Sequence, residues 1–317
     1  MIPEKACPGL DPGGTGFRTS CTNRSIDPVA EDETMLARMI AVALVLFLSP
    51  QLVPPLRAEL IVRPSPVVVV KVRPGVTVKN LALVKPKTTP AHAVMLFAGG
   101  DGLLNLQPNG TIGTRLSGNF LVRSRDRFVQ QGLFVAVVDT PNQVAINGNV
   151  RLSAQYAQDM AHVIADVRGR IDQGGKVWLV GTSSGTMSAA SIAARLPRLT
   201  PPTKDNLRRP DGIVLTSTQT RLVKGYCGRT VFNAKLSAVN VPGLVASHLA
   251  DACACSPPKN SVKVIAALIG APAKKNASFS GGDPPQSKDP CMAFTPHGFL
   301  GVEDKVVFAI ADFIGKH

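Results

Sequence analysis

The sequence predicts an α/β fold in which a mostly parallel sheet is covered by helices on both faces. From residue 91 onward, short apolar runs alternate with longer amphipathic segments. The runs are continuously hydrophobic, which is typical of parallel strands that are buried on both faces. The chain has 317 residues, of which 44% are hydrophobic and 18% charged. It is therefore long and apolar enough to bury one sizeable core.

The first elements predict an antiparallel edge of this sheet. Residues 66–73 and 76–86 are rich in Val and Leu and are separated by Pro74-Gly75, a turn signal between two strands. The buried strands expected after them cover 93–97, 134–138, 177–180, 213–215 and 244–246. The expected helices cover 152–170, 184–196, 256–268 and 301–314. Because no long linker interrupts residues 91–317, we expect one α/β domain.

Three segments lack a predicted element of their own. Residues 219–239 and 274–296 are long, and 105–119 is rich in Gly, Asn and Thr. Long loops in a compact domain are usually functional or loosely ordered. These segments are therefore the candidates for lining a pocket.

Residues 1–58 predict a disordered extension followed by a secretory signal peptide. Residues 1–34 show no apolar periodicity, whereas a start at Met35 would place a short basic segment before an unbroken apolar run over 39–48. That run is well short of the roughly 20 residues that a membrane anchor needs. We expect cleavage after Ala58, export to the periplasm or the medium, and a catalytic domain over 59–317.

The basic charge belongs to the predicted mature domain. Removing residues 1–58 removes five basic and six acidic residues, so the formal charge rises from +14 to +15. Nucleic-acid binding is disfavoured because Phe, Trp and Tyr make up only 5% of the chain, and single-strand binders stack bases on aromatic rings. A solvated basic surface, with electrostatic contact to an anionic envelope surface, is the alternative that we retain.

Four cysteines remain after the predicted cleavage. An even number in an exported protein predicts two disulfides, and four cysteines allow three connectivities. Pairing of Cys253 with Cys255 would close a strained ring, so we expect Cys291 to pair with Cys253 or Cys255, and Cys227 with the other. Their spacing matches no common zinc-ligand pattern, and we expect no metal and no cofactor.

The strongest motif for catalysis is Gly181-Thr182-Ser183-Ser184-Gly185. It follows the apolar run 177–180 and precedes alanines at helical spacing. This G-x-S-x-G between a buried strand and a small-residue helix predicts a nucleophile elbow, with Ser183 as the nucleophile. The two glycines are expected because the turn is too sharp for a Cβ there. A Gly/Ser-rich loop is the alternative, but it leaves the flanking pattern unexplained.

A nucleophilic serine needs a base, and the chain has five histidines. His297 lies in a loop just before the last predicted helix, from which it can reach the end of the sheet. His248 ends an apolar run and is expected to be structural. We therefore expect His297 to be the base.

The sequence offers few candidates for the carboxylate that orients the base. No Asp or Glu occurs between Asp211 and Asp251, so the loop after 213–215 contains none. Asp251 follows the next strand directly, where a buried carboxylate would set the tautomer of His297. Asp283 and Asp289, in a loop rich in Gly and Pro, are the alternatives.

The order Ser183, Asp251, His297 at these positions resembles the α/β-hydrolase superfamily, in particular its serine esterases and lipases. The resemblance covers about residues 91–317. It implies an oxyanion hole formed by one amide from the loop after an early strand and one beside the nucleophile. The corresponding amides here are those of Gly100 and Ser184. Ala98 stands where the family usually has His in that loop, a change that leaves the backbone donors in place.

These observations predict an exported serine hydrolase that cleaves a small-molecule carboxylic ester through an acyl-enzyme. The same groups would serve a lactonase, a thioesterase or a peptidase, and fold analogy does not choose among them. A non-catalytic binding protein of the same fold is the alternative from another class. The oligomeric state is not predicted.

Overall fold

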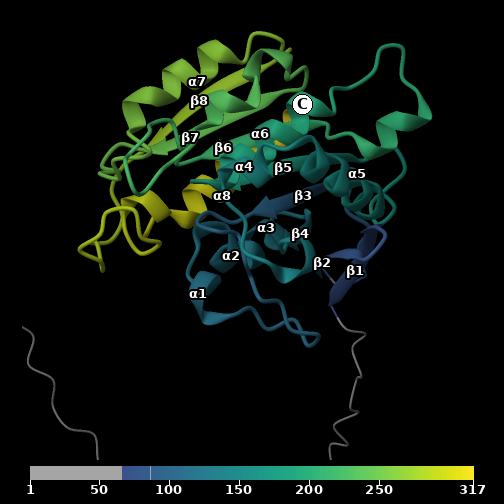
Figure 1. Ribbon diagram of the computed structural model, residues 1–317, viewed down its shortest axis with the longest axis horizontal. Helices are drawn as coiled ribbons and strands as arrows, with labels where there is room; N and C mark the ends of the chain where they lie inside the picture. The colour runs from purple at the N-terminus through teal and green to yellow at the C-terminus, as the bar shows by residue number, and fades with distance from the viewer. Residues whose placement is uncertain (1–65, 86) are drawn as a thin grey trace, which may run out of the picture. The chain divides into compact units, whose positions relative to one another are not determined.

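The computed structural model describes residues 66–85 and 87–317, which form an eight-stranded sheet with helices on both faces (Figure 1). The predicted extension, signal peptide and cleavage position lie outside these residues. The strand order is β1-β2-β4-β3-β5-β6-β7-β8. The strands are β1 (Val67–Arg73), β2 (Val76–Leu83), β3 (His92–Phe97), β4 (Phe134–Val138), β5 (Lys176–Thr182), β6 (Gly212–Thr216), β7 (Gly243–His248) and β8 (Lys274–Phe279).

The predicted antiparallel edge is confirmed. Strand β1 pairs antiparallel with β2, and β2 pairs antiparallel with β4. All later pairs in the sheet, from β4 through β8, are parallel. The fold is therefore α/β with a mostly parallel sheet, as the continuous apolar runs predict.

Both faces of the central strands are buried, so successive residues of one strand belong to different apolar clusters. On β3, Met95 packs in one cluster and Leu96 in the other, and on β5 Leu179 and Trp178 divide in the same way. Helices α5, α6 and α7 cover the first face, and α2, α3 and α8 cover the second. Such burial of apolar surface on both sides is the main source of stability for the sheet.

The α-helices are α1 (Thr114–Ser117), α2 (Phe120–Arg123), α3 (Arg125–Gln130), α4 (Gly148–Arg151), α5 (Ala154–Arg168), α6 (Gly185–Arg195), α7 (Ser261–Ala267) and α8 (Glu303–Lys316). The 3₁₀ turns are η1 (Pro141–Gln143), η2 (Lys204–Arg208), η3 (Val231–Ala234), η4 (Leu236–Ala238), η5 (Pro258–Asn260) and η6 (Pro296–Gly298). In the described part of the chain, no helix has the length and apolar character that a membrane crossing requires.

The structure corrects three sequence-based expectations. Residues 274–296 are not free of regular structure, because β8 pairs in parallel with β7. This strand has no apolar run, and most of its residues are exposed. Its pairing with β7 and the packing of Ala277 and Phe279 against the core hold it at the sheet edge. Helix α7 begins at Ser261 rather than 256, since Pro257 and Pro258 cannot continue a hydrogen-bonded helix. Residues 105–119 contain α1, and residues 219–239 contain η3 and η4; these elements have three or four residues each, too few for a periodic signal.

Candidate active site

Ser183 lies in the turn between β5 and α6. Its backbone is in the left-handed region with φ of 53°, which a residue with a side chain seldom adopts. The Ser183 N–H donates a 3.0 Å hydrogen bond to the carbonyl of Thr216 at the end of β6. The turn is therefore held against the neighbouring strand, and strained backbone of this kind is frequent at functional sites.

The two glycines of the motif are required by close backbone contacts. A Cβ on Gly181 would lie 2.3 Å from the carbonyl oxygen of Gly185, and one on Gly185 would lie 2.2 Å from the carbonyl oxygen of Phe97. Both distances are far shorter than van der Waals contact. The sharp turn packs helix α6 directly onto the end of β3, which agrees with the elbow that the sequence predicts.

Asp251 and His297, 46 residues apart in the chain, are hydrogen-bonded to each other. His297 Nδ1 and Asp251 Oδ2 are 2.9 Å apart, and both side chains are buried. The other carboxylate oxygen, Oδ1, accepts from the N–H of Cys253 at 2.9 Å. A carboxylate only accepts hydrogen bonds, so Nδ1 carries a proton, and in the neutral imidazole Nε2 then presents a lone pair.

The backbone of His297 is held from two sides. It lies in η6, whose first turn is capped by Thr295: the hydroxyl of Thr295 accepts from the His297 N–H at 3.2 Å. The Ser217 hydroxyl, just after β6, donates to the His297 carbonyl at 2.6 Å. These contacts place the imidazole at the same end of the sheet as Ser183.

His248 is engaged elsewhere, as a structural residue would be. Its Nε2 lies 2.9 Å from the carbonyl oxygen of Gly281, and its Nδ1 accepts from the N–H of Ala250 at 3.1 Å. Asp289 is likewise occupied, by the N–H of Cys291 and the hydroxyl of Tyr226. Neither residue competes with His297 and Asp251 for the position beside Ser183.

The turn that contains Gly100 is the predicted source of one oxyanion-hole amide. The Gly102 N–H donates to the Gly99 carbonyl at 3.1 Å, and Gly100 has φ of 58°. Ser184 precedes helix α6, where the helix dipole favours negative charge. Across the described residues, the N–H groups of Gly100 and Ser184 donate no hydrogen bond to the chain, so both remain available to a ligand.

Two side chains that sequence reasoning did not single out bind this turn. The Ser184 hydroxyl donates to the Gly100 carbonyl at 2.6 Å, although only its amide was expected to matter. Arg151, at the end of α4, is 2% exposed and donates to the carbonyls of Ala98 and Gly100. Burial lowers the pKa of the Arg151 guanidinium from its usual value. No sequence pattern marks an arginine at a helix end as buried, because arginine is mostly exposed.

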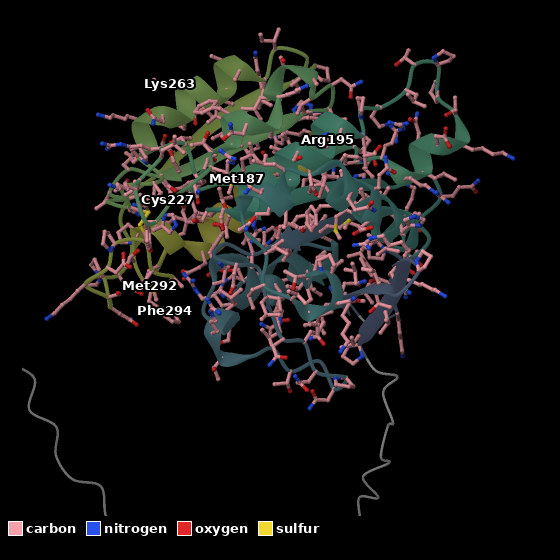
Figure 2. The ribbon with its side chains drawn as sticks, viewed as in Figure 1. Met187, Arg195, Cys227, Lys263, Met292 and Phe294 are labelled. Atoms are coloured by element: carbon pink, nitrogen blue, oxygen red, sulfur yellow. A yellow bond between two sulfur atoms is a disulfide. The ribbon has the colours of Figure 1, made fainter. Side chains whose placement is uncertain are left out.

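A cavity of about 980 Å³ connects these groups. Ser183, His297, Gly100 and Ser184 all line it, and no hydrogen bond joins Ser183 to His297 among the described residues. Such bonds are often long before substrate binds. Its walls include parts of all three segments expected to line a pocket: Thr114–Asn119, Tyr226–Arg229 and 291–294. Figure 2 labels four residues of this wall, namely Met187, Cys227, Met292 and Phe294.

Two disulfides, Cys227–Cys255 and Cys253–Cys291, lie beside the cavity. This is one of the two connectivities that the sequence leaves open, and it links the Asp251 loop to the His297 loop. Two groups of side chains in the described region have the spacing of metal ligands, and both include these cysteines. A sulfur in a disulfide is no thiolate ligand, so neither group offers a metal a full set of donors while the bridges are intact.

Comparison with solved structures identifies the fold. No protein-family model matches the sequence, and no curated protein matches it either. A thermophilic esterase from the planctomycete Thermogutta terrifontis, solved with butyrate bound, is similar with a TM-score of 0.51 and 17% sequence identity. The match covers 80% of this chain and 94% of that one. The native form of that esterase is similar with a TM-score of 0.50 and 17% identity, over 78% and 90% of the two chains. The chain has the α/β-hydrolase fold.

Within the α/β-hydrolase fold, the elbow after β5 and the loops after β7 and before α8 lie at the carboxyl ends of the strands. Ligands of open α/β sheets bind at that edge. At this level of identity the likeness establishes the fold, and the chemistry has to be argued from the residues of this chain.

Proposed function

We propose that this protein is a serine hydrolase that cleaves carboxylic esters through an acyl-enzyme intermediate. One observation carries the proposal: a serine in a strained elbow and a histidine bonded to the buried Asp251 carboxylate line the same cavity. This combination supplies a nucleophile, a base with a free Nε2 and a carboxylate that orients it.

In the proposed reaction, the Ser183 hydroxyl attacks the ester carbonyl while Nε2 of His297 takes its proton. Asp251 holds the imidazole and stabilises the positive charge that it acquires. The amides of Gly100 and Ser184 donate to the oxyanion of the tetrahedral intermediate. His297 then returns the proton to the leaving alcohol, and water attacks the acyl-enzyme by the same route.

The esterase activity of a protein with the same fold supports an ester substrate. The cavity is large enough for a small-molecule ester, since ligand pockets span about 300–1,000 Å³. The two disulfides favour an oxidising compartment, so we propose that the enzyme works in the periplasm or outside the cell. The excess of basic residues is suited to electrostatic contact with an anionic envelope surface.

The first test is Ser183→Ala, assayed with p-nitrophenyl esters of increasing acyl length. The expected result is loss of activity to the background rate and loss of labelling by a fluorophosphonate probe, with the circular dichroism spectrum unchanged. Ser117→Ala is the matched control, because Ser117 lines the same cavity and its hydroxyl donates only to the Thr114 carbonyl. Ester hydrolysis that persists in Ser183→Ala would refute the proposal.

A further inference from the structure

Arg151 is a buried cation with no carboxylate partner among the described residues. Its Nη1 donates to the Ser188 hydroxyl at 2.8 Å, and its Nη2 donates to the Ala98 and Gly100 carbonyls at 3.1 and 3.2 Å. Its Nε has no partner there. A charge buried in this way lowers stability, and an apolar side chain of similar volume would avoid that loss.

The contacts of Arg151 link the two elements that carry the proposed oxyanion-hole amides. Ala98 and Gly100 belong to the turn after β3, and Ser188 lies in the first turns of α6, just after Ser184. The chain also leaves space for the guanidinium: a Cβ on Gly102 would lie 2.7 Å from Nη2. The turn is therefore in direct contact with the side chain of Arg151.

These hydrogen bonds restrict the peptide that carries the Gly100 N–H. A peptide group is planar, so a carbonyl that is held also holds the following amide. Arg151 holds the peptide before this one, through the Ala98 carbonyl, and the peptide after it, through the Gly100 carbonyl. Gly99 and Gly100 have no Cβ, so their backbone has more rotational freedom than that of other residues. Arg151 adds to the restraint from the Gly102 N–H on the Gly99 carbonyl and from the Ser184 hydroxyl on the Gly100 carbonyl.

We propose that Arg151 is a positioning residue for the proposed ester hydrolysis: it holds the Gly99-Gly100 turn so that the Gly100 amide meets the oxyanion as it forms. This inference rests on the proposed function. It predicts an effect on the transition state rather than on substrate binding, because the oxyanion exists only after attack.

The experiment compares Arg151→Met and Arg151→Lys with the parent enzyme in the hydrolysis of p-nitrophenyl butyrate. Arg151→Met is expected to lower kcat by about a hundredfold with KM changed by less than about threefold. Arg151→Lys keeps the charge but reaches fewer acceptors, so its kcat should lie between that of Arg151→Met and that of the parent enzyme. Arg195→Met is the matched control: Arg195 also donates to a backbone carbonyl, but that carbonyl belongs to Leu152 and not to the turn after β3.

A second measurement separates positioning from a structural role. A trifluoromethyl ketone forms a tetrahedral adduct on the nucleophile, so its Ki should rise by the same factor as KM/kcat across the variants. A structural role alone would lower the folded fraction and leave kcat per labelled site unchanged. An Arg151→Met enzyme with parental kcat per site, or with an unchanged Ki, would overturn the inference.

Two further variants serve if Arg151→Met does not fold. Ser184→Ala removes the other side-chain donor to the Gly100 carbonyl, and the pair Arg151→Lys and Ser184→Ala forms a double-mutant cycle. Because both side chains hold one carbonyl, their effects on kcat should not be additive, and additive effects would overturn the inference. Failure of the proposed function gives a different result. In that case the Ser183→Ala enzyme would still hydrolyse the ester, independently of the kinetics of the Arg151 variants.

Discussion

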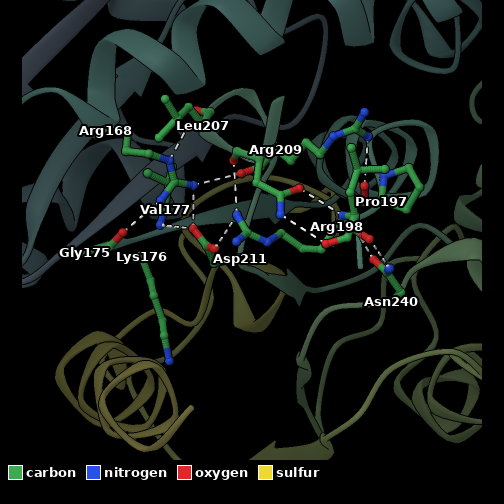
Figure 3. A network of polar contacts seen from close by, with 12 residues as sticks. Arg168, Gly175, Lys176, Val177, Pro197, Arg198, Leu207, Arg209, Asp211 and Asn240 are labelled. Atoms are coloured by element: carbon green, nitrogen blue, oxygen red, sulfur yellow. Dashed lines mark hydrogen bonds and ion pairs between the residues drawn. The ribbon is translucent and has the colours of Figure 1, made fainter. Parts of the chain in front are cut away.

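Polar networks lie at both ends of the central parallel strands, and they are built differently. At the amino ends, Asp211 precedes β6 and accepts from Arg168, Arg198 and the N–H of Val177 at 2.5, 2.9 and 2.8 Å (Figure 3). The remaining guanidinium bonds of Arg168 go to the carbonyls of Gly175, Leu207 and Arg209. The Asp211 carboxylate forms ion pairs with both Arg168 and Arg198, and the network joins α5, β5 and β6.

At the carboxyl ends, several groups lack such partners. Arg151 is buried without a carboxylate, Ser183 is strained, and the amides of Gly100 and Ser184 are unused within the described chain. The Asp251–His297 pair is internally satisfied, and it leaves Nε2 free. Under the proposed function, the Asp211 network serves stability, whereas the free amides and Nε2 at the opposite end are arranged for a substrate.

After Ser183→Ala, the largest effect on catalysis is expected from Asp251→Asn. An amide at this position can donate to Nδ1, which would move the ring proton to Nε2 and remove the base. We expect kcat to fall by about 10⁴-fold at neutral pH with little change in fold. Asp289→Asn is the control, since among the described residues the Asp289 carboxylate accepts from Cys291 and Tyr226 and not from a histidine. Steady-state kinetics and circular dichroism test this, and an active Asp251→Asn enzyme would exclude Asp251 as the orienting acid.

A smaller effect is expected from removing the bridge between the acid and base loops. Cys253 provides the N–H that binds Asp251, and Cys291 precedes His297 by six residues. Without this bridge the two loops can shift relative to each other, and an error near 1 Å costs about a hundredfold in rate. The double variant Cys253→Ser, Cys291→Ser should lower kcat at a temperature where circular dichroism still reports a folded protein.

The matched control is Cys227→Ser, Cys255→Ser, which opens the other disulfide. If the two double variants lost kcat equally, or if neither lost it while folded, the Cys253–Cys291 bridge would have a structural role only.

The smallest effect on catalysis is expected at the Asp211 network. Asp211→Ala removes one acceptor from each of two guanidinium groups and from the Val177 amide, which should destabilise the protein by about 1–3 kcal/mol. Thermal denaturation should detect this, while kcat per site labelled with fluorophosphonate stays at the parental value. A fall in kcat per labelled site would contradict the division between a stabilising end and a reactive end.

Much of the fold follows from local sequence patterns. The apolar runs predicted the central strands, and Pro74-Gly75 predicted the hairpin, because burial on two faces and tight turns each require particular residues. The elbow was predictable because its sharp turn leaves no room for a Cβ at Gly181 or Gly185, and both glycines lie within one five-residue motif. The pairing of Asp251 with His297 was predictable because the chain offers few candidates: it has five histidines and no Asp or Glu between Asp211 and Asp251.

Tertiary structure alone decided the rest. Strand β8 forms by pairing with β7 and has no apolar pattern of its own. The choice between two disulfide connectivities depended on distances between loops that are far apart in the chain. The burial of Arg151 against the Ala98 and Gly100 carbonyls depends on α4, α6 and the turn after β3 meeting in space. A sequence pattern records what each residue requires of its neighbours along the chain, whereas the environment of a side chain is set by the segments that pack around it.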